Sequence, residues 1–170
     1  MPFSSTGLSE TILTSLDTQG YRTPTPIQLE AIPPTLAGKD VLGIAQTGSG
    51  KTASFVLPIL DRLLKKSSAK HREPAVLILV PTRELADQVL KVIRAFTSEL
   101  PQGISSLAVY GGRSINTQMQ SLNKVDILVA TPGRLLDLID KNALELNSVS
   151  SLVLDEADKM LNLGFKEEVD

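Results

Sequence analysis

The chain has 170 residues, of which 42% are hydrophobic and 21% are charged, and it carries a formal net charge of −2 and no cysteine. These values describe one folded domain and exclude disulfide frameworks, thiolate metal sites and a surface that binds nucleic acid through overall positive charge. No apolar run reaches the roughly 20 residues that span a bilayer, and the first residues carry no secretion signal. We therefore expect a cytoplasmic protein without a membrane segment. The single histidine, His71, lies in a Lys-, Ser- and Arg-rich stretch that predicts a solvated loop.

Two helices are predicted near the start of the chain. The first is capped by Ser9 and ends at Gly20, since apolar residues recur on one helical face between them. Two prolines then interrupt the helical period, but Pro26 can open a second helix. We expect that helix to run to about Leu36 and to end at Gly38.

A strand, a helix and a second strand are predicted next. The apolar run 41–45 is typical of a short buried strand. The segment from Lys51 to about Leu64 has the spacing of a helix, which Pro58 is expected to kink. The continuous apolar run 75–80 indicates a strand that is buried on both faces.

The rest of the chain alternates between the helical and the strand period. We expect helices at 85–96, 115–122 and 135–139, and strands at 107–110, 127–130 and 152–154. This alternation predicts an α/β fold with a parallel sheet covered by helices on both faces. In such sheets ligands bind beyond the carboxyl ends of the strands.

The clearest chemical pattern is Ala45-Gln46-Thr47-Gly48-Ser49-Gly50-Lys51-Thr52, between a predicted strand and a predicted helix. Its glycines allow the chain to curl so that backbone N–H groups and the helix N-terminus face a phosphate. Lys51 can reach the β- and γ-phosphates, and Thr52 can give its hydroxyl to Mg²⁺. The strict P-loop pattern begins with Gly where this chain has Ala45, and an ordinary glycine-rich turn is the alternative interpretation.

A second pattern is the acidic pair at the end of the predicted strand 152–154. In a P-loop NTPase, a hydrophobic strand that ends in an acid supplies the carboxylate on the metal side. Asp155 would then hold the metal, and Glu156 would orient or deprotonate the attacking water. The alternative for such a strand-end acid is a helix N-cap, and the pairing with the P-loop favours the metal role.

The segment Asn123-Lys124-Val125-Asp126 matches the N-K-x-D pattern with which GTPases read guanine. In GTPases this pattern follows a strand, whereas here it precedes the predicted strand 127–130. We therefore interpret residues 123–126 as a turn.

Six blocks together resemble the DEAD-box RNA helicase family. In the family's order they are Gly20–Gln28, Ala45–Thr52, Pro81–Leu85, Gly111-Gly112, Thr131–Arg134 and Asp155–Asp158. Ala45 is usual at its place in this family, and Phe3 stands where the family has an isolated aromatic residue. The resemblance implies the first, RecA-like P-loop domain of a two-domain helicase, most similar to the bacterial RhlE-type branch.

For the nucleotide, the resemblance implies that the amide of Gln28 pairs with the adenine edge and selects ATP over GTP. It also implies that Tyr21 packs on the adenine face; in the alternative interpretation Tyr21 and Phe3 are core aromatics. Lys51, Asp155 and Glu156 would be catalytic, with Mg²⁺ held by Thr52 and Asp155. The implied nucleotide-binding residues are Tyr21, Thr23, Gln28, Gln46, Thr47, Gly48, Ser49, Gly50, Lys51 and Thr52.

For RNA, the resemblance implies contacts to the backbone, which carry little base specificity. Pro132 suits a first helical turn, so N–H groups near Gly133 can cap a phosphate while Arg134 adds charge. Arg83 and Arg134 would be structural ion-pair partners in the alternative interpretation. The implied RNA-binding residues are Pro81, Thr82, Arg83, Gly111, Gly112, Thr131, Pro132, Gly133 and Arg134, and Asp158 is assigned to interdomain coupling.

We expect a Gln-motif region at 1–38 and an incomplete RecA-like ATP-binding domain at 39–170 that stops within a helical segment, 165–169. The family's Ser-Ala-Thr block is absent, as is the second RecA-like domain with its arginine fingers. We therefore expect the isolated chain to bind ATP and RNA without efficient turnover and the second domain to be its partner. Two other classes stay open: another P-loop ATPase such as a DNA translocase, and a non-catalytic nucleotide- or RNA-binding module.

Overall fold

The structure is a computed structural model that describes residues 1–46, 48–66 and 73–162. Thr47, His71 and the predicted helical segment 165–169 lie outside the described residues. By its internal contacts the chain divides into two compact units. The helical unit comprises Met1–Ser68 and Val92–Gly103, and the sheet unit comprises Ala69–Lys91 and Ile104–Asp170.

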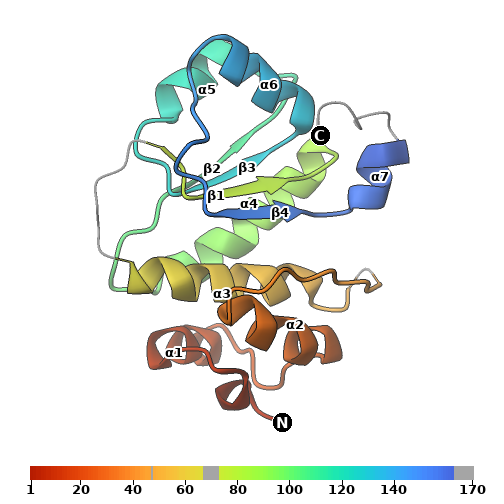
Figure 1. Cartoon of the computed structure of the whole chain (residues 1–170). Coiled ribbons are helices and arrows are strands. Elements are labelled where there is room, and N and C mark those ends of the chain that lie inside the picture. Colours follow the sequence, from red (N-terminus) through yellow and green to blue (C-terminus); the bar gives the residue numbers. More distant parts are fainter. Residues whose placement is uncertain (47, 67–72, 163–170) are drawn as a thin grey trace. The chain divides into compact units, whose positions relative to one another are not determined.

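The helical unit is built from the elements coloured red to yellow in Figure 1 and from the last part of α4. Its elements are the 3-10 helix η1 (Phe3–Thr6), α1 (Glu10–Thr18), α2 (Pro26–Leu36), α3 (Lys51–Lys65) and the residues of α4 (Arg83–Thr97) from Val92 onward. Helix α2 packs along α3, and η1 contacts α2. The largest fully buried side chains of this unit are Ile12, Leu16, Ile32, Leu57, Leu60, Ile93 and Phe96. Phe3 is also buried here.

A buried carboxylate connects α1 to α3. The side chain of Asp61 is fully buried and accepts a hydrogen bond from the backbone N–H of Ser9, the N-cap residue of α1, at 3.0 Å. Lys65 Nζ lies 2.8 Å from the other carboxylate oxygen of Asp61. Burial by itself raises the pKa of Asp61, but the hydrogen bonds from Lys65 and Ser9 outweigh it and hold the pKa below its ordinary value.

The sheet unit contains four parallel strands in the order β2-β3-β1-β4. The strands are β1 (Val76–Leu79), β2 (Ser106–Val109), β3 (Ile127–Ala130) and β4 (Ser151–Leu154), and the helices are the first part of α4, α5 (Ile115–Ser121), α6 (Pro132–Asp140) and α7 (Ala157–Asn162). In register, Val76 pairs with Ile127 and with Ser151, and Ser106 pairs with Ile127. The carboxyl ends of all four strands therefore lie at one edge of the sheet.

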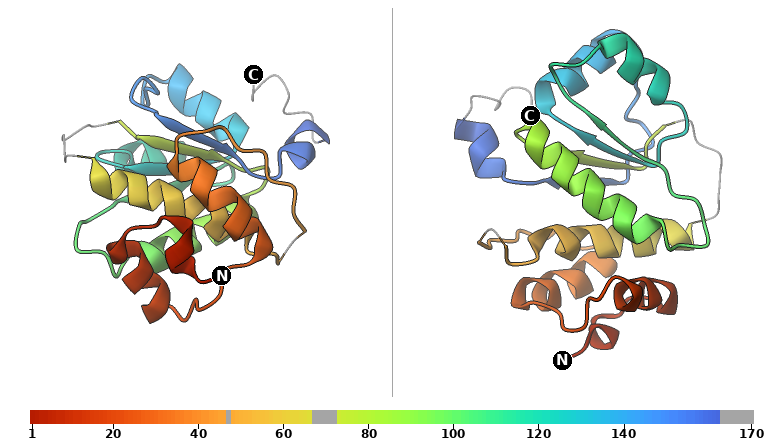
Figure 2. Two further views of the ribbon diagram at one scale, coloured as in Figure 1. Left: turned by 60° about the horizontal axis from the view of Figure 1, so that its bottom comes forward. Right: turned by 180° about the vertical axis from the view of Figure 1, so that it is seen from behind.

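Helices cover both faces of this sheet. Figures 1 and 2 show α5 and α6 over one face and the first part of α4, up to Lys91, over the other. All residues of β1 and β3 are buried, as expected for strands covered on both sides. One hydrophobic cluster joins Leu77, Leu79, Val109, Leu122, Val125, Leu128, Ala130, Leu135, Leu138, Leu144 and Met160. The predicted α/β fold with a parallel sheet is confirmed.

The predicted strand at 41–45 is wrong. These residues are irregular, and the exposed fractions are 42% for Val41 and 89% for both Leu42 and Ile44. The sheet of the described residues contains β1 to β4 and has no ladder to this segment. A strand requires a neighbour that satisfies its backbone N–H and C=O groups, and a short apolar run does not specify one.

Residues 123–126 form the predicted turn. Lys124 has a φ of 61°, and the carboxylate of Asp126 accepts the backbone N–H of Ser105 at 2.8 Å. Asp126 therefore stabilises the connection before β2 and β3. Across the described ranges, no helix is long and apolar enough to cross a membrane.

Candidate nucleotide and nucleic-acid sites

Within the helical unit, the side chain of Gln28 joins the start of α2 to the predicted P-loop. Its Oε1 accepts the backbone N–H of Thr25 at 2.9 Å, and its Nε2 donates to the carbonyl oxygen of Gly50 at 3.1 Å. Gln28 is 2% exposed. Two sequence blocks that are 22 residues apart are thus connected through one neutral amide.

Gly50 is the N-cap of α3, and its backbone conformation requires glycine. Its φ is 82°, and a Cβ built there would lie 2.5 Å from Nε2 of Gln28. Lys51 and Thr52 are the first residues of α3, so their backbone N–H groups lie at the helix end that attracts anions. This arrangement agrees with the P-loop interpretation of the described residues of 45–52.

A cavity of about 330 Å³ lies beside these residues in the helical unit. Ser49 lines it, and Ser49 Oγ is buried without a hydrogen-bond partner among the described residues. A buried hydroxyl without a partner is costly, which favours a polar ligand at this place. The lining residues are Thr25, Pro26, Ile27, Glu30, Ile44, Ala45 and Ser49.

Tyr21 and Thr23 precede α2 and are both exposed. The ring of Tyr21 contacts that of Phe96, with 5.3 Å between the centroids, and 39% of Tyr21 is exposed. Tyr21 is therefore only partly a core aromatic, whereas Phe3 is buried at 5% exposure. Gln46 is exposed in the irregular segment before the loop.

In the sheet unit, the acidic pair stands at the end of β4, as the sequence predicts. Asp155 is 5% exposed, and its backbone N–H donates to the carbonyl oxygen of Leu79 at 3.0 Å. Glu156 has a φ of 54°, a conformation that costs a non-glycine residue about 1–3 kcal/mol and that recurs at functional sites. Asp158 is exposed on the first turn of α7.

Lys159 pairs with the carboxylate of Glu156 one helical turn away. Lys159 Nζ lies 3.0 Å from Glu156 Oε2, and the hydrogen bond and charge of Glu156 raise the pKa of Lys159. Lys159 is mostly exposed, so this ion pair is open to solvent.

Arg83 and Gly112 lie together beyond the carboxyl ends of β1 and β2. The guanidinium of Arg83 stands 5.9 Å from the centroid of the Tyr110 ring. Gly112 has a φ of 84°, and a Cβ there would lie 3.3 Å from Arg83 Nη1. The sidechain hydroxyl of Thr82 accepts the backbone N–H of Leu85 at 3.2 Å and so caps the start of α4.

Arg134 is held by groups of the protein itself. Its Nη1 donates to the carbonyl oxygen of Arg113 at 3.0 Å and to Oε1 of Gln118 at 2.9 Å. Its Nε lies 3.6 Å from a carboxylate oxygen of Asp137, and 12% of its side chain is exposed. The structural role that was the alternative for Arg134 is therefore present. Pro132 opens α6 as expected, with Gly133 exposed after it.

The remaining predicted RNA contacts differ in exposure. Gly111 and Gly112 are exposed, Thr131 is half-buried, and Pro81 is buried. The structure brings Arg83, Gly112 and Arg134 to one edge of the sheet unit, because β1, β2 and β3 end there in register.

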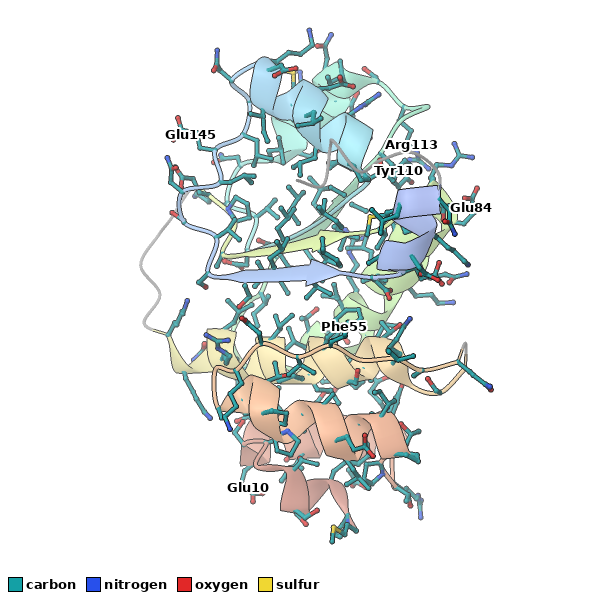
Figure 3. The ribbon with its side chains drawn as sticks, turned by 45° about the vertical axis from the view of Figure 1, so that its right-hand side comes forward. Glu10, Phe55, Glu84, Tyr110, Arg113 and Glu145 are labelled. Atoms are coloured by element: carbon teal, nitrogen blue, oxygen red, sulfur yellow. The ribbon has the colours of Figure 1, made fainter. Side chains whose placement is uncertain are left out.

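Sequence reasoning missed three residues of this edge: Tyr110, Arg113 and Gln118. Figure 3 shows Tyr110 and Arg113, and the guanidinium of Arg113 lies 5.5 Å from the ring centroid of Tyr110. Arg113 had a signal, since it follows the end of β2 in the same way that Arg83 and Arg134 follow the ends of β1 and β3. Gln118 is one polar residue in a short helix, and nothing in the sequence singles it out.

The family profile described as DEAD/DEAH box helicase matches residues 25–170. The chain belongs to this family. It is 50% identical over 171 residues to an ATP-dependent RNA helicase DeaD from Buchnera aphidicola subsp. Baizongia pistaciae, covering 100% of this chain and 28% of that protein. It is 47% identical over 169 residues to the protein of the same name from Escherichia coli strain K12, covering 99% of this chain and 26% of that protein.

Solved structures of the family are also similar to this chain. A DEAD box protein from the hyperthermophile Methanococcus jannaschii matches with a TM-score of 0.89 and 38% identity, covering 99% of this chain and 45% of that one. The yeast DEAD-box splicing factor Prp28 matches with a TM-score of 0.83 and 40% identity, covering 91% of this chain and 37% of that one. The chain thus spans about a quarter of the length of the DeaD relatives. The RhlE-type branch stays a prediction.

Proposed function

We propose that the chain is the ATP- and RNA-binding N-terminal part of an ATP-dependent RNA helicase, in which ATP hydrolysis is coupled to local unwinding of RNA duplexes. One observation carries the proposal: the amide of Gln28 joins the family's glutamine block to Gly50 of the P-loop. The two blocks then act as one structure that can take both the base and the phosphates of a nucleotide. The relatives named ATP-dependent RNA helicase support the same activity.

Gln28 is proposed to choose adenine. Its amide has two N–H donors and two acceptor positions, and the bonds to Thr25 and Gly50 use one of each. The remaining donor and lone pair match N7 and the N6-amino group of adenine. Tyr21 and Thr23, which are exposed before α2, are proposed to contact the same nucleoside, and Gln46 and the loop from Thr47 to Thr52 its phosphates.

Calorimetric titration with ATP and with GTP tests this role. Gln28→Ala should weaken ATP binding much more than GTP binding, because a buried amide without its partner costs about 1–3 kcal/mol. The matched control is Gln120→Ala on α5, which removes an exposed glutamine amide. An equal loss for both nucleotides would remove Gln28 from adenine selection.

Magnesium is the metal that this family's chemistry implies, and the donor groups of the chain suit it. Mg²⁺ takes one or two protein ligands and completes its octahedron with phosphate and water. We propose the hydroxyl of Thr52 and the buried carboxylate of Asp155 as those ligands. When bound, the ion would neutralise charge on the phosphates. Lys51 would contact the phosphates, and Glu156 would orient or deprotonate the attacking water.

The charges of Lys51 and Asp155 can be tested separately. Lys51→Ala should lower nucleotide affinity with or without Mg²⁺, since it removes a positive charge from the loop. Asp155→Asn should lower it mainly when Mg²⁺ is present. If Asp155→Asn has the same effect in EDTA and in Mg²⁺, the assignment of Asp155 to the metal is wrong.

RNA is proposed to contact the edge where β1, β2 and β3 end, through Pro81, Thr82, Arg83, Gly111, Gly112, Thr131, Pro132, Gly133 and Arg134. Arg134→Ala should weaken RNA binding about equally for unrelated sequences and flatten its salt dependence, because phosphates carry no sequence information. Filter binding over a salt series with several single strands is the measurement. A loss that depends on sequence would indicate base contacts.

The domain division at 1–38 and 39–170, the partnership with a second RecA-like domain and the coupling role of Asp158 are further parts of the proposal. Efficient turnover is assigned to the whole protein, because an arginine finger is worth about 10³–10⁵ in rate. RNA-stimulated phosphate release by the 170-residue chain on the order of 1 s⁻¹ would contradict this. The cytoplasm is the proposed compartment, supported by the bacterial RNA helicases among the relatives.

A further inference from the structure

Two arginines lie near the ring of Tyr110 at the carboxyl edge of the sheet unit. The guanidinium carbons of Arg83 and Arg113 are 5.9 Å and 5.5 Å from its ring centroid, both within the range of cation–π attraction. Arg83 comes from the start of α4 and Arg113 from the loop after β2. One aromatic ring therefore brings together two positive charges that are 30 residues apart in sequence.

Both the hydroxyl and the backbone carbonyl of Tyr110 make hydrogen bonds. Tyr110 is 4% exposed, and its hydroxyl donates to a carboxylate oxygen of Asp87 at 2.9 Å. Burial and the bond to Asp87 raise the pKa of the Tyr110 phenol, so it stays a donor at neutral pH. At the backbone, the carbonyl oxygen of Tyr110 accepts Nε2 of Gln118 at 3.0 Å.

Gln118 connects Tyr110 to a third arginine, Arg134. It is 7% exposed, and its Oε1 accepts Nη1 of Arg134, which also donates to the carbonyl oxygen of Arg113. The backbone of Arg113 is thus attached to Arg134 while its own guanidinium lies on Tyr110. Among the described residues Arg113 is exposed and makes no ion pair, so its charge is available to an anion.

The charges of Arg83 and Arg113 share one ring, and like charges held close together are unfavourable unless an anion compensates them. Asp87 contributes one negative charge at the hydroxyl end of the ring, and Asp137 faces Arg134. Arg113 lines a groove of about 520 Å³ together with Ser114, Thr117 and Ser121. Arginine and hydroxyl side chains that line one groove suit a sugar–phosphate chain.

We infer that Arg113 is a further contact to RNA phosphate and that Tyr110 and Gln118 are positioning residues, which hold Arg83, Arg113 and Arg134 as one cluster. This inference rests on the RNA binding proposed above. It adds Arg113, directly after the glycine pair, to the proposed RNA contacts. The ring of Tyr110 and the amide of Gln118 would position the arginines without themselves touching RNA.

Fluorescence anisotropy of the 170-residue chain with labelled oligouridylate, over about 50 to 200 mM salt, tests the contact. Arg113→Ala should lower affinity about 3- to 10-fold and reduce the salt slope by about 0.7, the value for one phosphate of a single strand. Arg113→Lys should keep the slope and lose less affinity. Lys141→Ala, which removes an exposed charge after the far end of α6, is the control and should change neither.

The positioning roles have their own comparison. Tyr110→Phe keeps the ring and should bind RNA with an affinity within about twofold of the parent. Tyr110→Leu should lose about as much affinity as Arg113→Ala. Its salt slope should stay closer to that of the parent, because all three arginine charges remain. Thermal unfolding shows whether each variant is folded. If Tyr110→Leu is not, Gln118→Leu replaces it, with the same expected loss of affinity and retained slope.

The outcomes separate this inference from the proposed function. If Arg113→Ala behaves like Lys141→Ala while Arg134→Ala still weakens binding, the inference is wrong and the RNA proposal stands. If Tyr110→Phe loses as much affinity as the leucine variant, the ring is not the positioning element. If neither Arg134→Ala nor Arg83→Ala differs from Lys141→Ala, the RNA proposal fails together with the inference.

Discussion

The two candidate sites are stabilised in different ways. At the P-loop, one neutral amide, that of Gln28, contacts a backbone carbonyl that glycine alone can place there. The second site is the arginine edge, where Arg83, Arg113 and Arg134 lie. There the contacts run through the ring of Tyr110, the amide of Gln118 and the backbone carbonyl of Arg113. The P-loop therefore depends on backbone conformation, and a single added Cβ should reduce its stability strongly. The arginine edge depends on side-chain contacts, and a single substitution there should reduce stability and binding less.

The largest expected effect is that of Gly50→Ala, which breaks the P-loop side of the comparison. The new Cβ would displace the Gln28 amide and leave Thr25 N–H and the Gly50 carbonyl without partners, in addition to the strain of positive φ. We expect the free energy of unfolding to fall by about 3–5 kcal/mol. Nucleotide binding should be lost as well. Denaturant unfolding and ATP titration are the measurements.

Gly48→Ala is the matched control for that variant. Gly48 has the same φ of 82°, but nothing lies within 4 Å of a Cβ built there. It should cost only the conformational strain, about 1–2 kcal/mol. Equal losses for the two alanines would mean that the contact with Gln28 contributes nothing.

The second effect concerns Asp61, the buried acid of the helical unit. Asp61→Asn keeps an acceptor for Ser9 N–H but removes the charge opposite Lys65. We expect the free energy of unfolding to fall by about 1–3 kcal/mol at neutral pH. The pKa of Asp61 is lower in the folded protein than the ordinary 3.8, so its contribution is present above about pH 4 and is lost as the pH falls through the folded value.

Chemical unfolding of the parent and of Asp61→Asn at neutral and at acidic pH measures this dependence. The difference between them should shrink below about pH 4. Asp17→Asn, an exposed acid of α1, is the control. A difference that stays constant through the acid range would contradict the charge argument.

The third effect applies the glycine test to the arginine edge. Gly112→Ala introduces positive-φ strain and a Cβ 3.3 Å from Arg83 Nη1, the end of a flexible side chain that can move away. We expect a loss of about 1–2 kcal/mol and weaker RNA binding, with the fold retained. Gly111→Ala, where a Cβ meets nothing within 4 Å, should cost less. If Gly112→Ala were as damaging as Gly50→Ala, the contrast between the two sites would be wrong.

The smallest effect is that of Lys159→Ala. Its partner Glu156 lies one turn away, and Lys159 itself is mostly exposed to solvent that screens the pair. The midpoint of denaturant unfolding should not change measurably. A clear destabilisation would show that the ion pair helps to hold Glu156 in its positive-φ conformation.

Much of the local structure was predictable because it depends on neighbours in the sequence. Pro26 opens α2 and Pro132 opens α6, since proline has a suitable φ and no N–H to satisfy at a first helical turn. The apolar run 75–80 contains the buried strand β1. The glycine loop before Lys51 was recognisable because φ values near 82° favour glycine.

Tertiary structure decided the features that depend on partners distant in sequence. Residues 41–45 have the apolar composition of a strand but no ladder, because pairing depends on sheet order and not on composition. Gln118 and Tyr110 lie at the candidate RNA site because β1, β2 and β3 are adjacent and in register, which brings three separate loops to one edge. Periodicity reports which face of an element is buried; it does not report which element lies against that face.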